Sequence, residues 1–336
     1  MKIVDGHLDL AYNALRGREV HRPASEQTPD EEGVPSVGLP DLRAGHVALV
    51  LATIFCEPQA GHRAGYSTPD EAAAAGMAQY DWYRQQIDAG VFRMVQTRGD
   101  LPESPAANAP LPMLLLLEGA DPIRTPQEIP AWKERGLRAV GLTWKLQNRF
   151  AGGNAQPGPL TAEGVAMARA LDAAGIIHDL SHLSDPSAFE LLDRVSGPVM
   201  ASHSNCRAIV PGQRQISDEI IRAIGRRNGM IGINFFDRFL LPVADQGARR
   251  ATLNDVIIHI RHICDRVGDA RHVGLGTDMD GGLGRDDIPE EIRSSADLPK
   301  LADALSRAGF SDGDVNAILA ENWLGFLGRS LAPAAG

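Results

Sequence analysis

Residues 112–118 read Pro-Met-Leu-Leu-Leu-Leu-Glu, an apolar run of strand length that ends in a carboxylate. A run that is apolar at consecutive positions, rather than at alternate ones, is typical of a strand covered on both faces in a parallel sheet. The chain contains seven other runs of this kind, and together the eight predict a parallel sheet. The other seven are residues 2–9, 47–55, 139–144, 176–182, 199–203, 230–235 and 273–278.

Helical patterns lie between most of these runs. Thr68-Pro69-Asp70-Glu71 supplies an N-cap, a proline in the first turn and early acidic residues before residues 72–89. Further helices are predicted over residues 161–174, 217–227, 252–267, 298–308 and 312–327. This alternation predicts a (β/α)8 TIM barrel with extra C-terminal helices, formed by residues 1–336 as a single domain. A doubly wound open sheet is the alternative, but no G-x-G-x-x-G motif follows the first strand.

The composition excludes several classes of protein. The 336 residues are 43% hydrophobic and 23% charged, which is typical of a globular chain. The net charge is −10, and no long Lys/Arg cluster occurs, so we expect neither nucleic acid nor a membrane as partner. The three cysteines are far apart, which argues against a disulfide framework. The first residues lack the apolar segment of a secretory signal, so we expect a cytoplasmic protein.

Five of the eight predicted strands end in histidine, aspartate or glutamate. Because the active site of a (β/α)8 barrel lies at the carboxyl ends of its strands, we expect these side chains to meet at one mouth. Burying them together without a partner would be unfavourable, so we expect cations between them. The residues concerned are His7, Asp9, Glu118, His182, His203 and Asp278.

The set contains three imidazoles and three carboxylates and no thiolate. This donor set fits Zn²⁺, Mn²⁺ or Fe²⁺, and it is too large for one tetrahedral zinc with an open position. Two divalent ions that share a carboxylate are therefore predicted, the arrangement that holds a hydroxide nucleophile in hydrolases. Taken alone, each residue also fits a capping or core role. His178, His259 and His262 are expected to be packing residues rather than ligands.

Five motifs, in this order, resemble the membrane (renal) dipeptidase family of the amidohydrolase superfamily. Arg214, eleven residues after His203, adds to the resemblance, which spans roughly residues 2 to 328. The motifs are Asp5-Gly6-His7-Leu8-Asp9-Leu10, Leu117-Glu118-Gly119, Asp179-Leu180-Ser181-His182, Ser202-His203-Ser204-Asn205-Cys206-Arg207 and Gly276-Thr277-Asp278-Met279-Asp280-Gly281.

The resemblance implies a barrel with two zinc ions. His7 and Asp9 would ligate one ion, and His182 and His203 the other. Glu118 would bridge both ions. A homodimer is expected from the resemblance alone.

The resemblance also implies roles around the metals. Asp278 would contact the metal-bound water and pass its proton to the leaving amine, and Arg214 would hold the substrate carboxylate. Two positions depart from the family pattern. Trp144 stands where family peptidases have a histidine, and an indole donates one hydrogen bond but carries no charge. Phe236 stands where some relatives have a tyrosine, so a pocket hydroxyl is missing.

We therefore expect a metal-dependent dipeptidase that hydrolyses small dipeptides, including those with a C-terminal D-residue, through a metal-bridging hydroxide. The alternative enzyme is an amidohydrolase that acts on another small amide or ester, such as an N-acyl amino acid. The alternative of another class is a non-catalytic binding barrel that keeps the metal cage. Asp278 argues against this last alternative, because a structural metal site does not need an extra carboxylate at its mouth.

Overall fold

The parallel strands close into a ring. The computed structural model describes residues 1–59, 65–103 and 109–333, and within these ranges nine strands form one sheet with the order β2-β1-β9-β8-β7-β6-β5-β4-β3. The pairing of Val50–Phe55 in β2 with Met113–Glu118 in β4 closes eight of them into a barrel. The predicted TIM barrel is confirmed. The strands are β1 (Ile3–Leu8), β2 (Val47–Phe55), β3 (Phe92–Met94), β4 (Leu111–Glu118), β5 (Leu137–Gly141), β6 (Ile177–Asp179), β7 (Val199–Ala201), β8 (Met230–Ile233) and β9 (Val273–Leu275).

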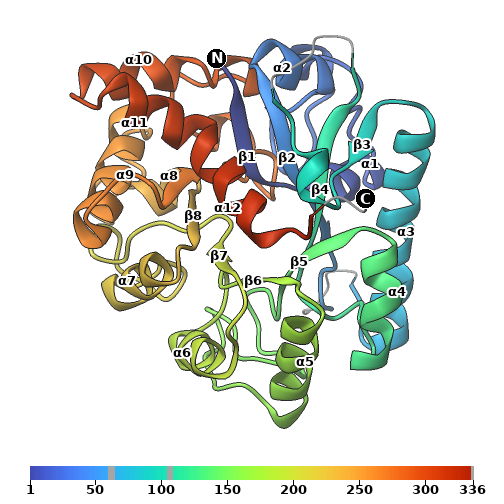
Figure 1. The fold of residues 1–336 in the computed structure, drawn as a ribbon. Coiled ribbons are helices and arrows are strands. Elements are labelled where there is room, and N and C mark those ends of the chain that lie inside the picture. Colours follow the sequence, from blue (N-terminus) through green and yellow to red (C-terminus); the bar gives the residue numbers. More distant parts are fainter. Residues whose placement is uncertain (60–64, 104–108, 334–336) are drawn as a thin grey trace.

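Helices cover the outside of the barrel, as Figure 1 shows. The α-helices are α1 (Leu10–Leu15), α2 (Leu39–Ala44), α3 (Pro69–Asp88), α4 (Ile129–Glu134), α5 (Ala162–Ala173), α6 (Asp185–Arg194), α7 (Asp218–Arg226), α8 (Asp237–Leu240), α9 (Leu253–Val267), α10 (Lys300–Arg307), α11 (Asp312–Asn316) and α12 (Asn322–Ser330). A π-helical segment (Ala317–Glu321) joins α11 to α12. None of the described helices has the length and apolar character needed to cross a bilayer.

The longer helices begin where the sequence predicts. The hydroxyl of Thr68 accepts a hydrogen bond from the backbone of Glu71, whose side chain bonds back to the cap. Thr161 and Ser217 cap α5 and α7 by accepting a hydrogen bond from the backbone of Gly164 and of Ile220. Gly268 ends α9 with a φ of 94°, a left-handed conformation that glycine adopts without strain. Five helices were not predicted: α1, α2, α4 and α8, which have six residues or fewer, and the longer α6.

The strands end earlier than the sequence predicts. Predicted runs reach His182, His203 and Asp278, but β6, β7 and β9 end two or three residues before them. The backbone of His182 and of Asp278 is left-handed, with φ of 67° and 58°, which takes these residues out of the extended ladder. Asp9 likewise lies just beyond β1, as the N-cap of α1. These site residues therefore lie on the loops that leave the strands.

The bottom of the barrel is closed by α12, which lies in the middle of the ring of strands in Figure 1. Trp323 is fully buried against an apolar layer inside the ring, and its Nε1 donates to the carbonyl of Leu275 at 2.8 Å. A Cβ on Gly6 would lie 2.4 Å from the indole ring, so β1 needs glycine there. The interior layer comprises Val4, Leu49, Leu51, Leu114, Leu116, Ala139, Ile177, Met200 and Met230.

The segment 18–40 is fastened beside the top of the barrel. The carboxylate of Asp280, just after β9, accepts hydrogen bonds from the backbone of Ser36 at 2.8 Å and of Val37 at 2.9 Å. Arg18 is buried and forms an ion pair with the same carboxylate, with Nη1 2.9 Å from Oδ1. This long connection therefore covers the barrel wall next to Asp278.

Candidate metal centre

Glu118 occupies the top layer of the barrel interior. Leu114 and Leu116 point into the barrel, and Glu118 follows them by two-residue steps on the same face of β4. Its Oε1 lies 3.0 Å from Nε2 of His182 and 3.3 Å from Nε2 of His203. These three buried donor atoms form one potential metal site.

A second group of donors lies on the other side of Glu118. Nε2 of His7 lies 3.5 Å from the other glutamate oxygen, Oε2. The same nitrogen is 3.9 Å from Oδ1 of Asp9 and 4.0 Å from Oδ1 of Asp278. His7, Asp9 and Asp278 form a second potential metal site. The structure thus brings all six residues of the predicted set together, with one Glu118 oxygen toward each group.

The nitrogen donors fit a cation. Nδ1 of His182 donates to Oδ1 of Asn154 at 3.0 Å, which leaves a lone pair on Nε2. Nε2 of His203 lies only 3.0 Å away. Zn–N bonds of about 2.0 Å at a tetrahedral angle would place two nitrogens about 3.3 Å apart. Two lone pairs and a carboxylate oxygen at this separation repel one another unless a cation or a proton lies between them.

The charges of the cluster are unbalanced. Burial opposes protonation of His7, but the facing carboxylates, Glu118 foremost, raise its pKa to about 10. Glu118 is also buried, yet the positive charge of His7, foremost, and the three neighbouring imidazoles hold its pKa well below the ordinary value. Burial raises the pKa of Asp278 to about 8 and that of Asp9 to about 6. One positive imidazolium does not balance three ionised carboxyl groups, which is why two of them hold their protons more tightly than usual; divalent cations would take the place of those protons.

The other two imidazoles are held neutral. Burial lowers the pKa of His182 to about 4, and the charge of Arg214 acts in the same direction. Burial also lowers the pKa of His203 well below its ordinary value. A neutral imidazole is the form that ligates a metal ion.

Three polar residues around the donors were not predicted from the sequence. Ser202 lies between two of the imidazoles, with Oγ 3.2 Å from Nδ1 of His7 and 2.7 Å from Nδ1 of His203. Asn234 donates from Nδ2 to Oδ2 of Asp278 at 2.8 Å. Asn154 is the partner of His182 described above. Ser202 lies two residues after Met200, and Asn234 lies four residues after Met230. Both methionines point into the barrel, so the alternation of side chains along a strand places the two polar residues in the interior as well.

Asp179 is a further carboxylate of this layer that was quoted in a motif but not predicted as a site residue. It lies within reach of His7 and His203 in a third group of potential donors. Its Oδ1 accepts hydrogen bonds from the backbone of Ser181 at 3.0 Å and of Ser202 at 2.9 Å. Asp179 thus fixes the loops that follow β6 and β7.

Arg214 lies at the edge of the metal centre. Its Nη2 donates to the carbonyl of His203 at 2.8 Å, and its Nη1 donates to Oγ of Ser204 at 3.2 Å. Its guanidinium lies over the ring of Phe239, 5.2 Å from the centroid, a contact that was not predicted. The ring of Phe236, one of the predicted pocket residues, is half-buried against Phe239 with centroids 4.9 Å apart. These rings fix the direction of the guanidinium.

Trp144 forms an aromatic wall on the other side. Its ring lies 6.1 Å from that of His182 and 4.9 Å from that of Phe55, at the end of β2. Phe55 in turn lines a hollow of about 290 Å³ together with Tyr12 and Tyr66. The wall therefore connects the metal donors to a recess beside them.

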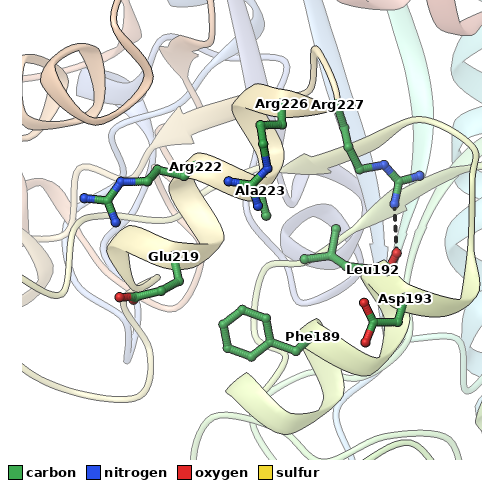
Figure 2. Close-up of a pocket in the computed structure, with 8 residues that line it drawn as sticks. All are labelled: Phe189, Leu192, Asp193, Glu219, Arg222, Ala223, Arg226 and Arg227. Atoms are coloured by element: carbon green, nitrogen blue, oxygen red, sulfur yellow. Dashed lines mark hydrogen bonds between the residues drawn. The ribbon is translucent and has the colours of Figure 1, made fainter.

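Another hollow, of about 370 Å³, lies between α6 and α7 on the outer layer of helices (Figure 2). Phe189 and Arg222 are among the residues that line it, and Arg227 donates to the carbonyl of Leu192 at 3.3 Å across one end. None of the candidate metal donors lines this hollow, so it is separate from the centre at the barrel mouth.

The three histidines that the sequence predicts to be packing residues each have a partner in the structure. His178 faces Asp172 with Nε2 3.3 Å from Oδ1, and His262 faces Asp218 at 2.7 Å. His259 receives a hydrogen bond on Nδ1 from the backbone of Cys206 at 3.0 Å.

Comparisons with known sequences give a consistent result. A family model described as "Membrane dipeptidase (Peptidase family M19)" matches residues 1–330. The "Uncharacterized protein in pqqA 5'region" of Klebsiella pneumoniae is 30% identical over 247 residues, which are 70% of this chain and 88% of that protein. "Dipeptidase aclJ" of Aspergillus oryzae is 28% identical over 98% of this chain and 80% of its own length.

Solved structures share the fold over nearly the whole chain. The structure described as dipeptidase AC, a metallopeptidase of family M19, is 25% identical, has a TM-score of 0.82 and is matched over 98% of both chains. A metallopeptidase from Rhodobacter sphaeroides, solved with a phosphinate mimic of the dipeptide L-Ala-D-Ala, is 24% identical with a TM-score of 0.83 over 98% of this chain and 99% of that chain.

Proposed function

The chain belongs to the membrane dipeptidase family (peptidase family M19), and from this premise we propose that it hydrolyses small dipeptides, including those with a C-terminal D-residue, at the centre around Glu118. The observation that carries the proposal is the position of this carboxylate. One of its oxygens faces the Nε2 atoms of His182 and His203, and the other faces Nε2 of His7. Such an arrangement suits a carboxylate that bridges two ions.

Two divalent ions, proposed to be Zn²⁺, would be held by His7 and Asp9 on one side and by His182 and His203 on the other, with Glu118 between them. When bound, they supply an activated bridging water as the nucleophile and polarise the substrate carbonyl. The donor types also suit Mn²⁺ or Fe²⁺, so geometry and supply would select the metal.

Asp278 is the proposed proton carrier. Asn234 donates to its Oδ2, which fixes the carboxylate so that Oδ1 faces the donor cluster, 4.0 Å from Nε2 of His7. From this position, Oδ1 would take the proton of the attacking water and give it to the leaving amine.

Arg214 is the proposed anchor for the carboxylate at the C-terminal end of the substrate. Each of its two amino groups uses one N–H within the protein, on the His203 carbonyl and the Ser204 hydroxyl, and has a second N–H left. The solved relative from Rhodobacter sphaeroides carries a mimic of L-Ala-D-Ala, which is why we include L,D-dipeptides among the proposed substrates.

The hydrolysis of N-acyl amino acids or other small amides is the second candidate, and Trp144 is the observation that favours it. The indole next to His182 and Phe55 offers an apolar wall to an acyl group and cannot supply the positive charge of a histidine.

One experiment tests both candidates. The purified protein is analysed for zinc, manganese and iron, and its activity is measured on L,L-dipeptides, L,D-dipeptides and N-acyl amino acids before and after treatment with a chelator. We expect two ions per chain, dipeptide hydrolysis, loss of activity on chelation and its return with Zn²⁺. Activity on N-acyl amino acids alone would replace the first candidate by the second, and activity unaffected by metal removal would contradict both.

A further inference from the structure

A chain of serine hydroxyls lies beneath the metal centre. Ser202 Oγ contacts both Nδ1 of His7 at 3.2 Å and Nδ1 of His203 at 2.7 Å. Ser202 Oγ is also placed to donate to Oγ of Ser181 at 3.4 Å, and the latter lies 3.2 Å from Oγ of Ser204. All three serines are buried, so no bulk water replaces a missing partner.

Each hydroxyl has one hydrogen to donate, which restricts the directions of the hydrogen bonds among the three serines. A metal ion on Nε2 requires that the hydrogen of a neutral imidazole sits on Nδ1. With ions on both sides of Glu118, His7 and His203 each direct an Nδ1–H at the same oxygen. Ser202 then accepts twice, and its only hydrogen goes to Ser181.

The hydrogen bonds of Ser181 and Ser204 are consistent with donation from Ser202 to Ser181. Ser181 Oγ already accepts from the backbone N–H of His203 at 3.2 Å, so its own hydrogen is directed to Ser204. Ser204 Oγ also accepts from Nη1 of Arg214, which can only donate. Every hydroxyl from Ser202 to Ser204 therefore has a partner when both ions are bound.

A hydroxyl is also suited to the metal-free state. In that state the hydrogen of His203 can sit on Nε2, 3.3 Å from Oε1 of Glu118, and Ser202 donates to the bare Nδ1. Rotation about the Cβ–Oγ bond of Ser202 therefore lets the same hydroxyl accept from His203 when ions are bound and donate to it when they are not. A backbone carbonyl, which only accepts, could not do this.

We propose that Ser202 is a positioning residue for both halves of the metal centre: its single hydroxyl fixes the Nδ1–H tautomer of His7 and of His203 and so directs both Nε2 lone pairs at the ions. The inference rests on the proposed function, because it needs ions at both Nε2 atoms. It also couples the two halves, since one side chain supports a ligand of each.

Three serine-to-alanine variants separate this role from general damage to the fold. Ser202→Ala removes the shared acceptor. Ser204→Ala removes a hydroxyl that is two hydrogen bonds away from Ser202 and contacts Arg214. Ser295→Ala is the matched control, because Ser295 is equally buried and its Oγ has no hydrogen-bond partner among the described residues.

Each protein is loaded with Zn²⁺, and its ions are counted by elemental analysis and titrated against a chelator of known affinity. We expect Ser202→Ala to weaken the binding of both ions by about 10- to 100-fold. Ser295→Ala should match the wild type, and Ser204→Ala should keep both ions and raise KM for dipeptides. Unchanged affinity in Ser202→Ala, a loss restricted to one ion, or equal loss in Ser204→Ala would overturn the proposal.

A measurement on the wild type keeps the test independent of how the variants fold. Long-range ¹H–¹⁵N spectra of the Zn²⁺-loaded protein with labelled histidine report which ring nitrogen carries the hydrogen. We expect Nδ1–H for His7 and His203, and an Nε2–H tautomer at either residue would overturn the proposal. A wild type that binds no Zn²⁺ would instead contradict the proposed function, which distinguishes the two failures.

Discussion

The two ends of this barrel are built from opposite kinds of residue. At the bottom, Trp323 of α12 packs into an apolar layer and makes one hydrogen bond, to the carbonyl of Leu275. At the top, the same strands deliver buried carboxylates and imidazoles that face one another around Glu118. The bottom resembles an ordinary protein core, whereas the top concentrates charge that burial disfavours.

β1 shows how close these two ends lie along the chain. Gly6 has no side chain because the indole of Trp323 fills that space, and His7, the next residue, provides a candidate metal donor. The comparison teaches that stability and chemistry are divided by position along each strand of this barrel. A substitution at one end should therefore leave the property of the other end nearly unchanged.

The largest effect is expected from Asp278→Asn at the top. The amide keeps the shape and the left-handed backbone but cannot carry the proton, so kcat should fall by about 10³-fold or more. Zinc content and the free energy of unfolding should stay near those of the wild type. Steady-state kinetics, elemental analysis and urea unfolding check this, with Asp88→Asn on the exposed end of α3 as the matched control. Unchanged turnover would refute the role of Asp278.

Trp323→Ala tests the bottom in the opposite direction. The indole is fully buried, so its removal should lower the free energy of unfolding by about 3–5 kcal/mol. The kcat of the protein that remains folded should change by less than about threefold, which is under 1 kcal/mol. Trp82→Ala on α3, where the ring is only half-buried, should cost less stability. Loss of bound zinc in Trp323→Ala would show that the two ends are not independent.

His259 tests whether the loop after β7, which supports the top, also contributes to stability. Burial lowers the pKa of His259 to about 4, against about 6.5 in the unfolded chain. The unfolded chain therefore binds the proton more tightly, so stability is full above pH 7 and falls as the pH drops toward 4. From pH 7 to pH 5 this group should account for a loss of about 2 kcal/mol.

The measurement compares urea unfolding of the wild type and His259→Gln at both pH values. The variant should lose less stability on acidification than the wild type does, because its side chain does not titrate. The backbone N–H of Cys206 donates to Nδ1, so a protonated ring would oppose one donor with another. If both proteins lost the same free energy of unfolding between pH 7 and pH 5, protonation of His259 would not be the cause of the loss.

The smallest effect is expected from Trp144→His, which changes only the aromatic wall beside the metal donors at the top of the barrel. A histidine there can donate a hydrogen bond and carry charge near the substrate carbonyl. The ratio of kcat/KM for dipeptides to that for N-acyl amino acids should rise by up to about tenfold, or about 1.4 kcal/mol. Kinetics on both substrate types check this, with Trp144→Phe as the control that keeps the aromatic wall. A fall in the ratio would favour the second candidate function.

The sequence predicts the eight strands of the ring because they are apolar at consecutive positions and covered on both faces. β3 escapes prediction because it has three residues, two of them half-buried, and pairs only with the start of β4. α6 could have been found, since Asp185 and Pro186 in its first turn form a recognisable start. The single domain, the homodimer and the cytoplasmic location stay predictions.

The six donors could be found from the sequence because each one lies at the end of a strand or just beyond it. Their supporting residues could not, because Asn234 meets Asp278 across 44 residues and Ser202 reaches His7 across 195. Hydrogen bonds between distant segments leave no periodic signal in the chain. The roles assigned to the donors and to Arg214 came from the resemblance and are taken up in the proposed function.

The left-handed backbone at Asp278 has an energetic consequence. A non-glycine residue in this conformation holds about 1 kcal/mol or more of strain, which glycine would release. Asp278→Gly would release this strain, but it would also remove the proposed proton carrier and leave Nδ2 of the buried Asn234 without its acceptor. Under the proposed role of Asp278, the strained backbone therefore serves the reaction rather than the fold.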